Sequence, residues 1–173
     1  MSYAAANAIT VRRARTSDVS EVRRLVDPYV REGILLDKAT VTLYEAIQEF
    51  WVAEHGEGGR VVGCGALHVM WEDLAEVRTL AVDPEFKGTG VGHHVLGELL
   101  ETARRLGVRR VFCLTFEVDF FSKHGFVEIG ETPVDGDVYS ELLRSYDEGV
   151  AEFLGLERVK PNTLGNSRML LHL

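Results

Sequence analysis

The chain has 173 residues, enough for one domain with a sizeable hydrophobic core. Hydrophobic residues make up 46% and charged residues 27%, the composition of an ordinary globular protein. The formal net charge of −8 argues against nucleic acid as a partner, because contacts to phosphates need a basic patch.

Neither the N-terminal residues nor the apolar runs indicate a membrane segment. The longest uncharged runs, such as residues 61–71, are too short to span a bilayer. Residues 1–8 are small and polar without a basic segment, which predicts a disordered tail before a single domain at 9–173. Cys64 and Cys113 lie in apolar runs, where buried free thiols are expected. We therefore expect a cytoplasmic protein.

The first elements alternate a strand with helices. Residues 10–13 are predicted to form a strand. Asp18 and Glu21 have the spacing of a capping box, and apolar residues then follow a helical period as far as Tyr29. A short apolar break at residues 33–38 ends this unit.

A second helix and a hairpin follow. Thr42 and Glu45 repeat the capping-box spacing and open a predicted helix that extends to Phe50. Residues 51–55 and 60–69 then read as two strands around a glycine-rich turn, which is the pattern of a hairpin.

The next stretch indicates a site for a phosphate group. A strand is predicted at residues 76–82, and a Pro stop and glycines at positions 88, 90 and 92 follow it. An amphipathic helix then runs from about Gly90 to Arg105, with Gly107 as its C-cap. The first amides of such a helix are unpaired and attract anions, so the turn predicts a phosphate-bearing cofactor.

The last third completes the sheet. Residues 110–116 read as a buried parallel strand, and a short helix is expected to end at Gly125 before a strand at 126–129. One longer helical segment is predicted at 137–154, and a strand at 167–173 closes the chain. The order predicts an α/β fold with helices on both faces of the sheet.

The glycine turn fits neither of two common phosphate motifs. A dinucleotide fingerprint would need a glycine at His93, and a Walker A loop needs Gly-Lys-Ser/Thr at its end. Lys87-x-x-Gly90-x-Gly92 instead resembles motif A of the GCN5-related N-acetyltransferases, which hold the pyrophosphate of acetyl-CoA. Residues 120–126, Phe-Phe-Ser-Lys-His-Gly-Phe, resemble motif B of the same family.

This resemblance implies a mixed, splayed central sheet, acetyl-CoA as the acetyl donor and no metal. It also implies that the bulged strand before the turn contributes backbone groups to pantetheine. The cofactor-binding residues expected on these grounds are Leu80, Ala81, Val82, Lys87, Gly88, Thr89, Gly90, Val91, Gly92, His93 and Phe121. No Cys/His spacing indicates a metal site.

A closer resemblance is to the acetyltransferase domain of N-acetylglutamate synthases, above all the short actinobacterial form without a kinase domain. It is carried by residues 33–36, Glu76-x-x-Thr79, residues 111–115 and Asn166-Ser167. The resemblance implies transfer of an acetyl group to the α-amine of L-glutamate, the first step of arginine biosynthesis.

Glu76 is the candidate general base, because an α-amine is mostly protonated at neutral pH. A solvated carboxylate at a strand end is the alternative reading. Strict alternation would put Glu76 and Thr79 on opposite faces, so both serve one site only across a β-bulge, which the family carries. Thr79 and Thr115 match synthase positions near the substrate and the thiolate; β-branched strand filler is the alternative for both.

Two positions depart from the family pattern. Phe121 stands where the family has its general-acid tyrosine, so Thr115, a water or Tyr139 must substitute, or the thiolate leaves without help. Lys87 replaces the usual Gln or Arg of motif A and keeps a charge that suits phosphate.

A glutamate acceptor needs cations for two carboxylates. The available ones are Lys38, Arg78, Arg144, Lys160 and Arg168. From the resemblance we expect the substrate to contact Leu35, Lys38, Arg78, Thr79, Ser167 and Arg168. Asp37 and Gly165 stand where synthases have basic residues, which leaves glutamate or glutamine open.

Three further alternatives stay open. Phe121 also fits a non-catalytic acyl-CoA-binding sensor. The acidic balance suits a cationic acceptor, either a protein N-terminus or a polyamine. A homodimer is compatible with the sequence, which does not decide the oligomeric state.

Overall fold

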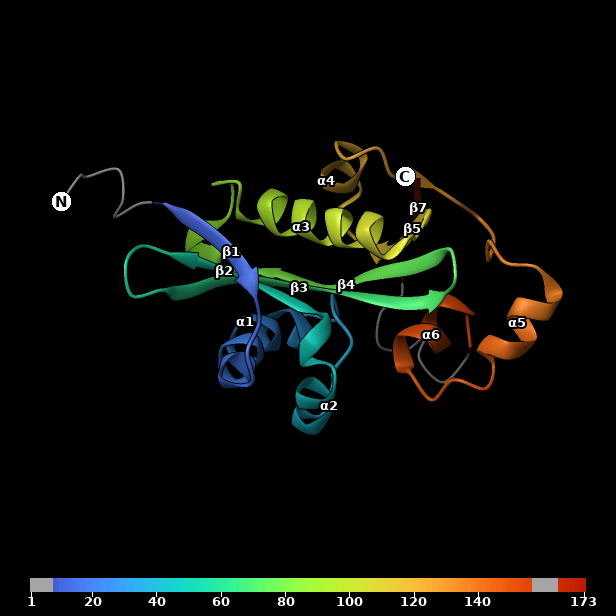
Figure 1. Cartoon of the computed structure of the whole chain (residues 1–173), viewed down its shortest axis with the longest axis horizontal. Coiled ribbons are helices and arrows are strands. Elements are labelled where there is room, and N and C mark those ends of the chain that lie inside the picture. Colours follow the sequence, from blue (N-terminus) through green and yellow to red (C-terminus); the bar gives the residue numbers. More distant parts are fainter. Residues whose placement is uncertain (1–7, 157–164) are drawn as a thin grey trace.

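The computed structural model describes residues 8–156 and 165–173. Its strands form one mixed sheet in the order β1-β2-β3-β4-β5-β7-β6 (Figure 1). Neighbouring strands are antiparallel, except that β4 and β5 are parallel. The strands are β1 (Ile9–Arg13), β2 (Phe50–His55), β3 (Arg60–Trp71), β4 (Leu74–Val82), β5 (Arg110–Thr115), β6 (Val127–Glu128) and β7 (Ser167–His172).

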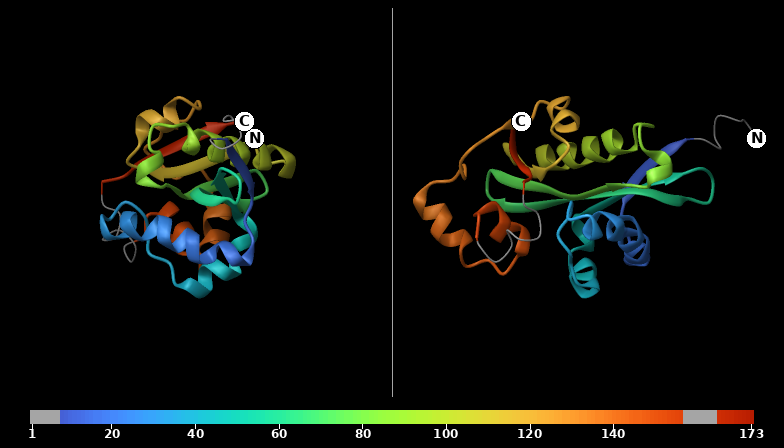
Figure 2. Two further views of the ribbon diagram at one scale, coloured as in Figure 1. Left: turned by 90° about the vertical axis from the view of Figure 1, so that its left-hand side faces the viewer. Right: turned by 180° about the vertical axis from the view of Figure 1, so that it is seen from behind.

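Helices cover both faces of this sheet, which confirms the predicted α/β architecture. The helices are α1 (Val19–Arg31), α2 (Thr40–Glu45), α3 (Val91–Leu106), α4 (Val118–Ser122), α5 (Gly136–Leu142) and α6 (Glu148–Phe153). Figures 1 and 2 show α3 and α4 on one face, with α1, α2 and α6 on the other. No helix of the described part of the chain is long and apolar enough to cross a membrane.

The long helix α3 organises one of the hydrophobic clusters. It begins after Gly90 and ends before Gly107, and both glycines have the left-handed conformation that L-residues avoid, with φ of 91° and 83°. Its apolar face, with Val95 and Leu99 fully buried, packs on the sheet. Two further clusters lie under α1 and α2 and between α5, α6 and the β5–β7 end of the sheet.

The sheet is splayed in its middle, as the family resemblance implied. The parallel pairing of β4 with β5 covers only residues 74–76 opposite residues 110–112. Beyond that point β4 continues to pair with β3, and β5 continues to pair with β7. The two strands therefore leave an opening between residues 77–82 and the end of β5.

Two predicted details in the first third of the chain differ from the structure. The Asp18 carboxylate does not cap α1, because it accepts hydrogen bonds from Arg12 and from the Arg15 amide. The second helix begins at Thr40 and ends at Glu45, before a 3-10 turn at 47–49, and Phe50 already belongs to β2. Apolar spacing alone did not reveal where this helix stops.

The predicted segment at 137–154 is two short helices rather than one. Asp135 accepts a hydrogen bond from the Val138 amide at the start of α5, and Asp147 accepts one from the Val150 amide at the start of α6. Each capping carboxylate starts a new helix, so the chain turns between residues 143 and 147.

Some of the predictions concern residues that lie partly or wholly outside the described part of the chain. Of the predicted tail, only Ala8 is described, and its carbonyl accepts a hydrogen bond from Gly56 N. Residues 1–7 and Lys160 lie outside the described residues. Cys64 and Cys113 are buried free thiols, as predicted, and burial raises the pKa of Cys64 to about 12.

Candidate functional site

A cavity of about 500 Å³ occupies the opening between β4 and β5. Its walls come from the end of α1, the splayed strands, the glycine turn, the start of α3, and α4. The lining residues are Tyr29, Ile34, Leu35, Val77, Arg78, Thr79, Leu80, Val82, Phe86, Lys87, Gly88, Gly90, Val91, Gly92, His93, Leu114, Thr115, Phe116, Glu117, Phe120, Phe121 and Lys123. A cavity of this size can hold a ligand of cofactor dimensions.

A β-bulge in β4 shapes the cavity wall. Thr79 has φ of 56°, and it lies with Leu80 opposite the single residue Gly65 of β3. The extra residue shifts the alternation of side chains. Val77 and Leu80 therefore both face the α3 side of the sheet, whereas the strand without a bulge would separate them. The bulge expected from the family resemblance is thus present.

The glycine turn gives the cavity a bare backbone. Gly88 and Gly90 have φ of 77° and 91°, and a Cβ atom at either would meet no protein atom within 4 Å. Their surface therefore faces open space. Gly92 has a different role, because a Cβ there would lie 3.2 Å from the Phe120 ring. It lets the first turn of α3 pack closely against α4, with the free α3 amides beside the turn.

Most predicted cofactor residues line this cavity, and two do not. Leu80, Val82, Lys87, Gly88, Gly90, Val91, Gly92, His93 and Phe121 belong to its walls. Ala81 is buried on the opposite face of β4, where α1 packs. Thr89 is exposed and its hydroxyl donates to the Phe86 carbonyl, which stabilises the turn.

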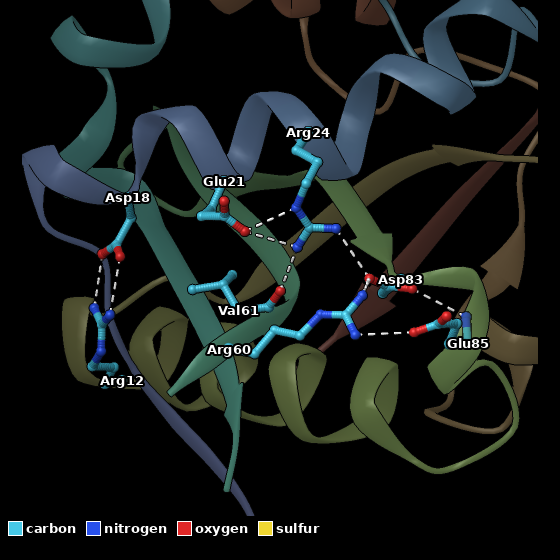
Figure 3. Close-up of polar contacts among 8 residues, drawn as sticks. All are labelled: Arg12, Asp18, Glu21, Arg24, Arg60, Val61, Asp83 and Glu85. Carbon is cyan, nitrogen blue, oxygen red and sulfur yellow. Dashed lines mark hydrogen bonds and ion pairs between the residues drawn. The ribbon is translucent and has the colours of Figure 1, made fainter. Parts of the chain in front are cut away.

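The buried carboxylate of Asp83 stabilises the chain just before the glycine turn. Asp83, which is 3% exposed, accepts hydrogen bonds from Arg24 at 3.0 Å, Arg60 at 2.9 Å and the Glu85 amide at 3.1 Å (Figure 3). Burial alone would raise the pKa of Asp83, but these donors outweigh it and keep the pKa below its usual value. Arg24 belongs to α1 and Arg60 to β3, so Asp83 joins three elements just before the glycine turn.

Tyr29 is a cavity residue that its helical period did not reveal. Its hydroxyl donates a 2.7 Å hydrogen bond to the Val82 carbonyl, and Lys87 Nζ lies 5.2 Å from its ring centroid. The predicted phosphate ligand Lys87 is therefore placed over an aromatic face at the mouth of the cavity.

An aromatic group closes the α4 side. The His93 ring packs at a tilt against Phe120 with ring centroids 4.6 Å apart, and His93 Nδ1 lies 2.7 Å from His124 Nε2. Burial and the neighbouring His93 lower the pKa of His124. Phe121 is 5% exposed and packs edge-on to Phe120, so the position of the family tyrosine is apolar.

The candidate base is buried and ion-paired. Glu76 is 5% exposed, and its Oε2 accepts a 2.7 Å hydrogen bond from Arg78 Nη2. Arg78 Nη1 donates to Asp147 Oδ2 at 2.8 Å. Glu76 is not among the lining residues of the large cavity, whereas Arg78 is. Arg78, the ion-pair partner of Glu76, therefore links this carboxylate to the wall of the cavity.

A second cavity of about 190 Å³ shares Arg78 with the large cavity and is lined mostly by charged and polar side chains. It is lined by Lys38, Thr42, Glu45, Ala46, Glu49, Phe50, His68, Arg78 and Asp147. Burial and the nearby Arg78 lower the pKa of Lys38. Its ammonium makes no hydrogen bond or ion pair with a described residue, whereas His68 Nδ1 lies 2.7 Å from Glu49 Oε1.

Sequence reasoning found Lys38 and Arg78 in this second cavity but missed Glu49, His68 and Asp147. They come from three distant segments, and none belongs to a motif. Arg78 lines both cavities, so it marks the junction between the cofactor-sized cavity and the charged one.

The other predicted residues divide into two groups. Leu35, Thr79 and Thr115 line the large cavity. Ser167 is the strand partner of Thr115 but lines neither cavity. Arg168 packs on the rings of Phe112 and Phe153 and donates to the Phe153 carbonyl, and burial lowers its pKa.

Arg168 therefore contacts α6 from β7 and does not belong to the lining of either cavity. Of the remaining candidates, Arg144 is exposed and pairs with Glu141, and Tyr139 packs in the cluster of α5 and α6. Neither belongs to the lining of the two cavities. No cluster of three or more His, Cys, Asp or Glu side chains suited to a metal occurs among the described residues.

Comparisons with known proteins match this architecture. Residues 20–126 match the model of the acetyltransferase (GNAT) family. The amino-acid acetyltransferase of Mycobacterium tuberculosis is 63% identical over 162 residues, which are 93% of this chain and 92% of that protein. A solved M. tuberculosis structure in complex with CoA and NLQ has a TM-score of 0.91 at 62% identity, covering 95% of this chain and 99% of that one. N-acetylglutamate synthase of Neisseria gonorrhoeae, complexed with coenzyme A and N-acetyl-glutamate, has a TM-score of 0.75 at 24% identity over 96% of this chain and 35% of that one, a likeness of fold.

Proposed function

This chain belongs to the acetyltransferase (GNAT) family, and we propose that it transfers the acetyl group of acetyl-CoA to the α-amine of an amino acid, with L-glutamate as the acceptor. One observation carries this proposal. A cofactor-sized cavity with a bare glycine turn meets a small charged cavity at the single residue Arg78. A donor in the first cavity and an amino acid in the second would meet beside β4. The product would be N-acetylglutamate, which enters arginine biosynthesis in the cytoplasm.

The residues of the large cavity suit each part of acetyl-CoA. The backbone of residues 87–92 and the free amides of α3 would hold the pyrophosphate, with Lys87 as a further cation. The unpaired edge of β4 beyond Glu76 would bind pantetheine through its backbone. Phe120 and Phe121 supply an apolar wall where the thioester arrives. Acetyl-CoA supplies the activated acetyl group, and the protein supplies alignment and proton transfer.

Proton removal from the amine falls to Glu76 in this proposal. Its carboxylate is held by Arg78 Nη2, so its orientation is fixed before the substrate binds. Because Glu76 lines neither cavity, the proton would reach it through a water beside Arg78. A proton is also needed for the departing thiolate, and Thr115 is the candidate donor. Thr115 Oγ1 accepts a hydrogen bond from the Glu117 amide at 2.8 Å, which leaves its own hydrogen directed elsewhere and available to the thiolate.

The charges of the second cavity bear on the acceptor. Lys38 is the cation there that makes no ion pair with a described residue, and it suits one carboxylate of the substrate. Arg78 is already shared between Glu76 and Asp147. The second carboxylate of glutamate would therefore find no unpaired arginine in this cavity. Glutamine is a second candidate acceptor, because its side-chain amide is neutral.

The direct test measures thiol release from acetyl-CoA with each of the twenty amino acids, a polyamine and an N-terminal peptide. The proposal predicts turnover with glutamate. It predicts turnover with glutamine instead if the pairing of Arg78 with Glu76 and Asp147 prevents binding of a second carboxylate. Turnover with the peptide or polyamine alone would contradict the amino-acid acceptor. Binding of CoA without turnover on any acceptor would favour a non-catalytic sensor.

A further inference from the structure

We propose that Asp147, together with Gly149, is a positioning residue for acetyl transfer, because it holds Arg78 in the orientation in which Arg78 holds Glu76. This inference rests on the proposed function, since it needs Glu76 to act as the base. Neither residue belongs to the family motifs in this sequence. They lie at the start of α6, and Asp147 is 69 residues from Arg78 along the chain.

The contacts form a chain of direct bonds. Asp147 Oδ2 accepts from Arg78 Nη1 at 2.8 Å, and Arg78 Nη2 donates to Glu76 Oε2 at 2.7 Å. The side chains of Arg78 and Glu76 are 8% and 6% exposed, so this pair is nearly dry. An arginine side chain is flexible, and one carboxylate alone would leave its guanidinium free to turn about that bond. The second carboxylate fixes the plane of the guanidinium.

Asp147 is itself held rigidly. Its Oδ1 accepts a 2.9 Å hydrogen bond from the Val150 amide, so the side chain caps α6 while the other oxygen faces Arg78. Burial alone would raise the pKa of Asp147, but the Arg78 guanidinium and the Val150 amide outweigh it and keep the carboxyl ionised. Because the cap fixes Asp147 on α6, the position of α6 also fixes the guanidinium of Arg78.

Gly149 provides the space that this arrangement needs. A Cβ atom there would lie 2.5 Å from Arg78 Nη2 and 2.6 Å from Cζ. The guanidinium therefore lies directly against the α6 backbone, and any side chain would displace it. Gly149 does not have a positive φ, so its backbone conformation suits alanine. Close approach of Arg78, rather than backbone geometry, is what requires a glycine here.

An unsatisfied hydrogen-bond donor of Arg78 supports a functional role for this residue. Arg78 Nε is buried and has no hydrogen-bond partner among the described residues. An unsatisfied buried donor is unfavourable, and an arginine placed only for stability would be expected to satisfy its donors. Arg78 instead lines both cavities, and its two terminal nitrogens are paired with carboxylates.

The test compares kcat and KM of Asp147→Asn and Gly149→Ala in two backgrounds, the parent and Glu76→Gln, in the full chain with glutamate and acetyl-CoA. Asn keeps the α6 cap and removes the charge that faces Arg78. Ala keeps the charge and displaces the guanidinium. Each should lower kcat roughly 10- to 100-fold in the parent, with the acetyl-CoA KM within about twofold. Glu141→Gln, an exposed carboxylate on α5, is the control and should leave kcat unchanged.

Combination with Glu76→Gln separates positioning from general damage. If Asp147 acts through Glu76, each substitution should add little once Glu76 is gone, because residues that act as a unit are not additive. An equal fold loss in both backgrounds, or parental kcat in Asp147→Asn and Gly149→Ala while Glu76→Gln is impaired, would overturn the positioning role and leave the proposed function intact. Parental kcat in Glu76→Gln would overturn the base assignment and the positioning role together, while turnover of glutamate would still support the proposed acetyl transfer. Should Asp147→Asn not fold, Gly149→Ala decides in the same way.

Discussion

The role of the glycine turn is tested most sharply by comparing Gly90→Val with Gly58→Val. Both glycines have nearly the same positive φ, 91° and 93°, and a Cβ atom at either meets nothing within 4 Å. Gly58 lies in the turn between β2 and β3, away from the lining of either cavity. The pair therefore shares its backbone strain and differs in whether the new side chain enters the large cavity.

The strain can be estimated from the conformation. A left-handed backbone costs an L-residue about 1–2 kcal/mol, and a domain of this size loses about 2–4 °C in Tm per kcal/mol. Both variants should therefore melt about 2–8 °C below the parent. Only Gly90→Val should also lose affinity for CoA. Loss of one charge-assisted hydrogen bond is worth about 1.5–3 kcal/mol, so Kd should rise about 10- to 150-fold.

The assays are thermal melts and calorimetric titration of CoA into each variant. The strain argument requires similar melting temperatures, and the cofactor argument requires a difference in Kd. If Gly90→Val binds CoA as tightly as Gly58→Val does, the pyrophosphate is not held by this turn. In that case the placement of the cofactor in the large cavity is refuted.

Two further variants test the acceptor and the support of the turn. Lys38→Met should raise the KM for glutamate at least about 10-fold in steady-state kinetics and leave the KM for acetyl-CoA unchanged, because it removes the unpaired cation. Arg144→Met, which replaces an exposed arginine, is the control. Equal KM values for glutamate in Lys38→Met and Arg144→Met would contradict the role of Lys38. Asp83→Asn should cost roughly 1–2 kcal/mol near pH 7, since Arg24 and Arg60 are half exposed. The Asp83 pKa is depressed on folding, so its contribution is present above the usual value of 3.8 and is lost as the pH falls below it. A Tm difference between parent and Asp83→Asn that persists unchanged at pH 3 would contradict this account.

The glycine turn was predictable from sequence because its signals are local. A Pro stop, alternate glycines and the first apolar period of a helix occur within ten or so residues, and each has a direct structural meaning. The parallel strand at 110–116 was predictable for the same reason. Its continuous apolar run reflects burial on both faces.

The bulge at Thr79 was predictable only from the family resemblance. Alternation of side chains, taken alone, places Glu76 and Thr79 on opposite faces, and nothing in the residues announces a positive φ at a threonine. The break between α5 and α6 was also not visible in the apolar spacing. It depends on Asp147, whose carboxylate could equally have been a solvated helix residue.

The charged cavity was the least predictable part of the site. Lys38, Glu49, Arg78 and Asp147 come together from separate elements, and no local pattern links them. Arg168 shows the converse. As an isolated arginine near the end of the chain it is predicted to bind a substrate carboxylate, and its packing against Phe112 and Phe153 could not be read from the sequence.

The central claim is amino-acid acetylation with Glu76 as the base, and thiol release by the parent and by Glu76→Gln tests it most directly. Both enzymes would be assayed with saturating acetyl-CoA and glutamate at pH 7 and at pH 9. The account predicts turnover by the parent and a kcat about 10²–10⁴-fold lower for Glu76→Gln at pH 7, with nearly unchanged affinity for acetyl-CoA. The deficit should shrink at pH 9, where more of the amine is unprotonated. Parental kcat in Glu76→Gln at pH 7 would contradict the account.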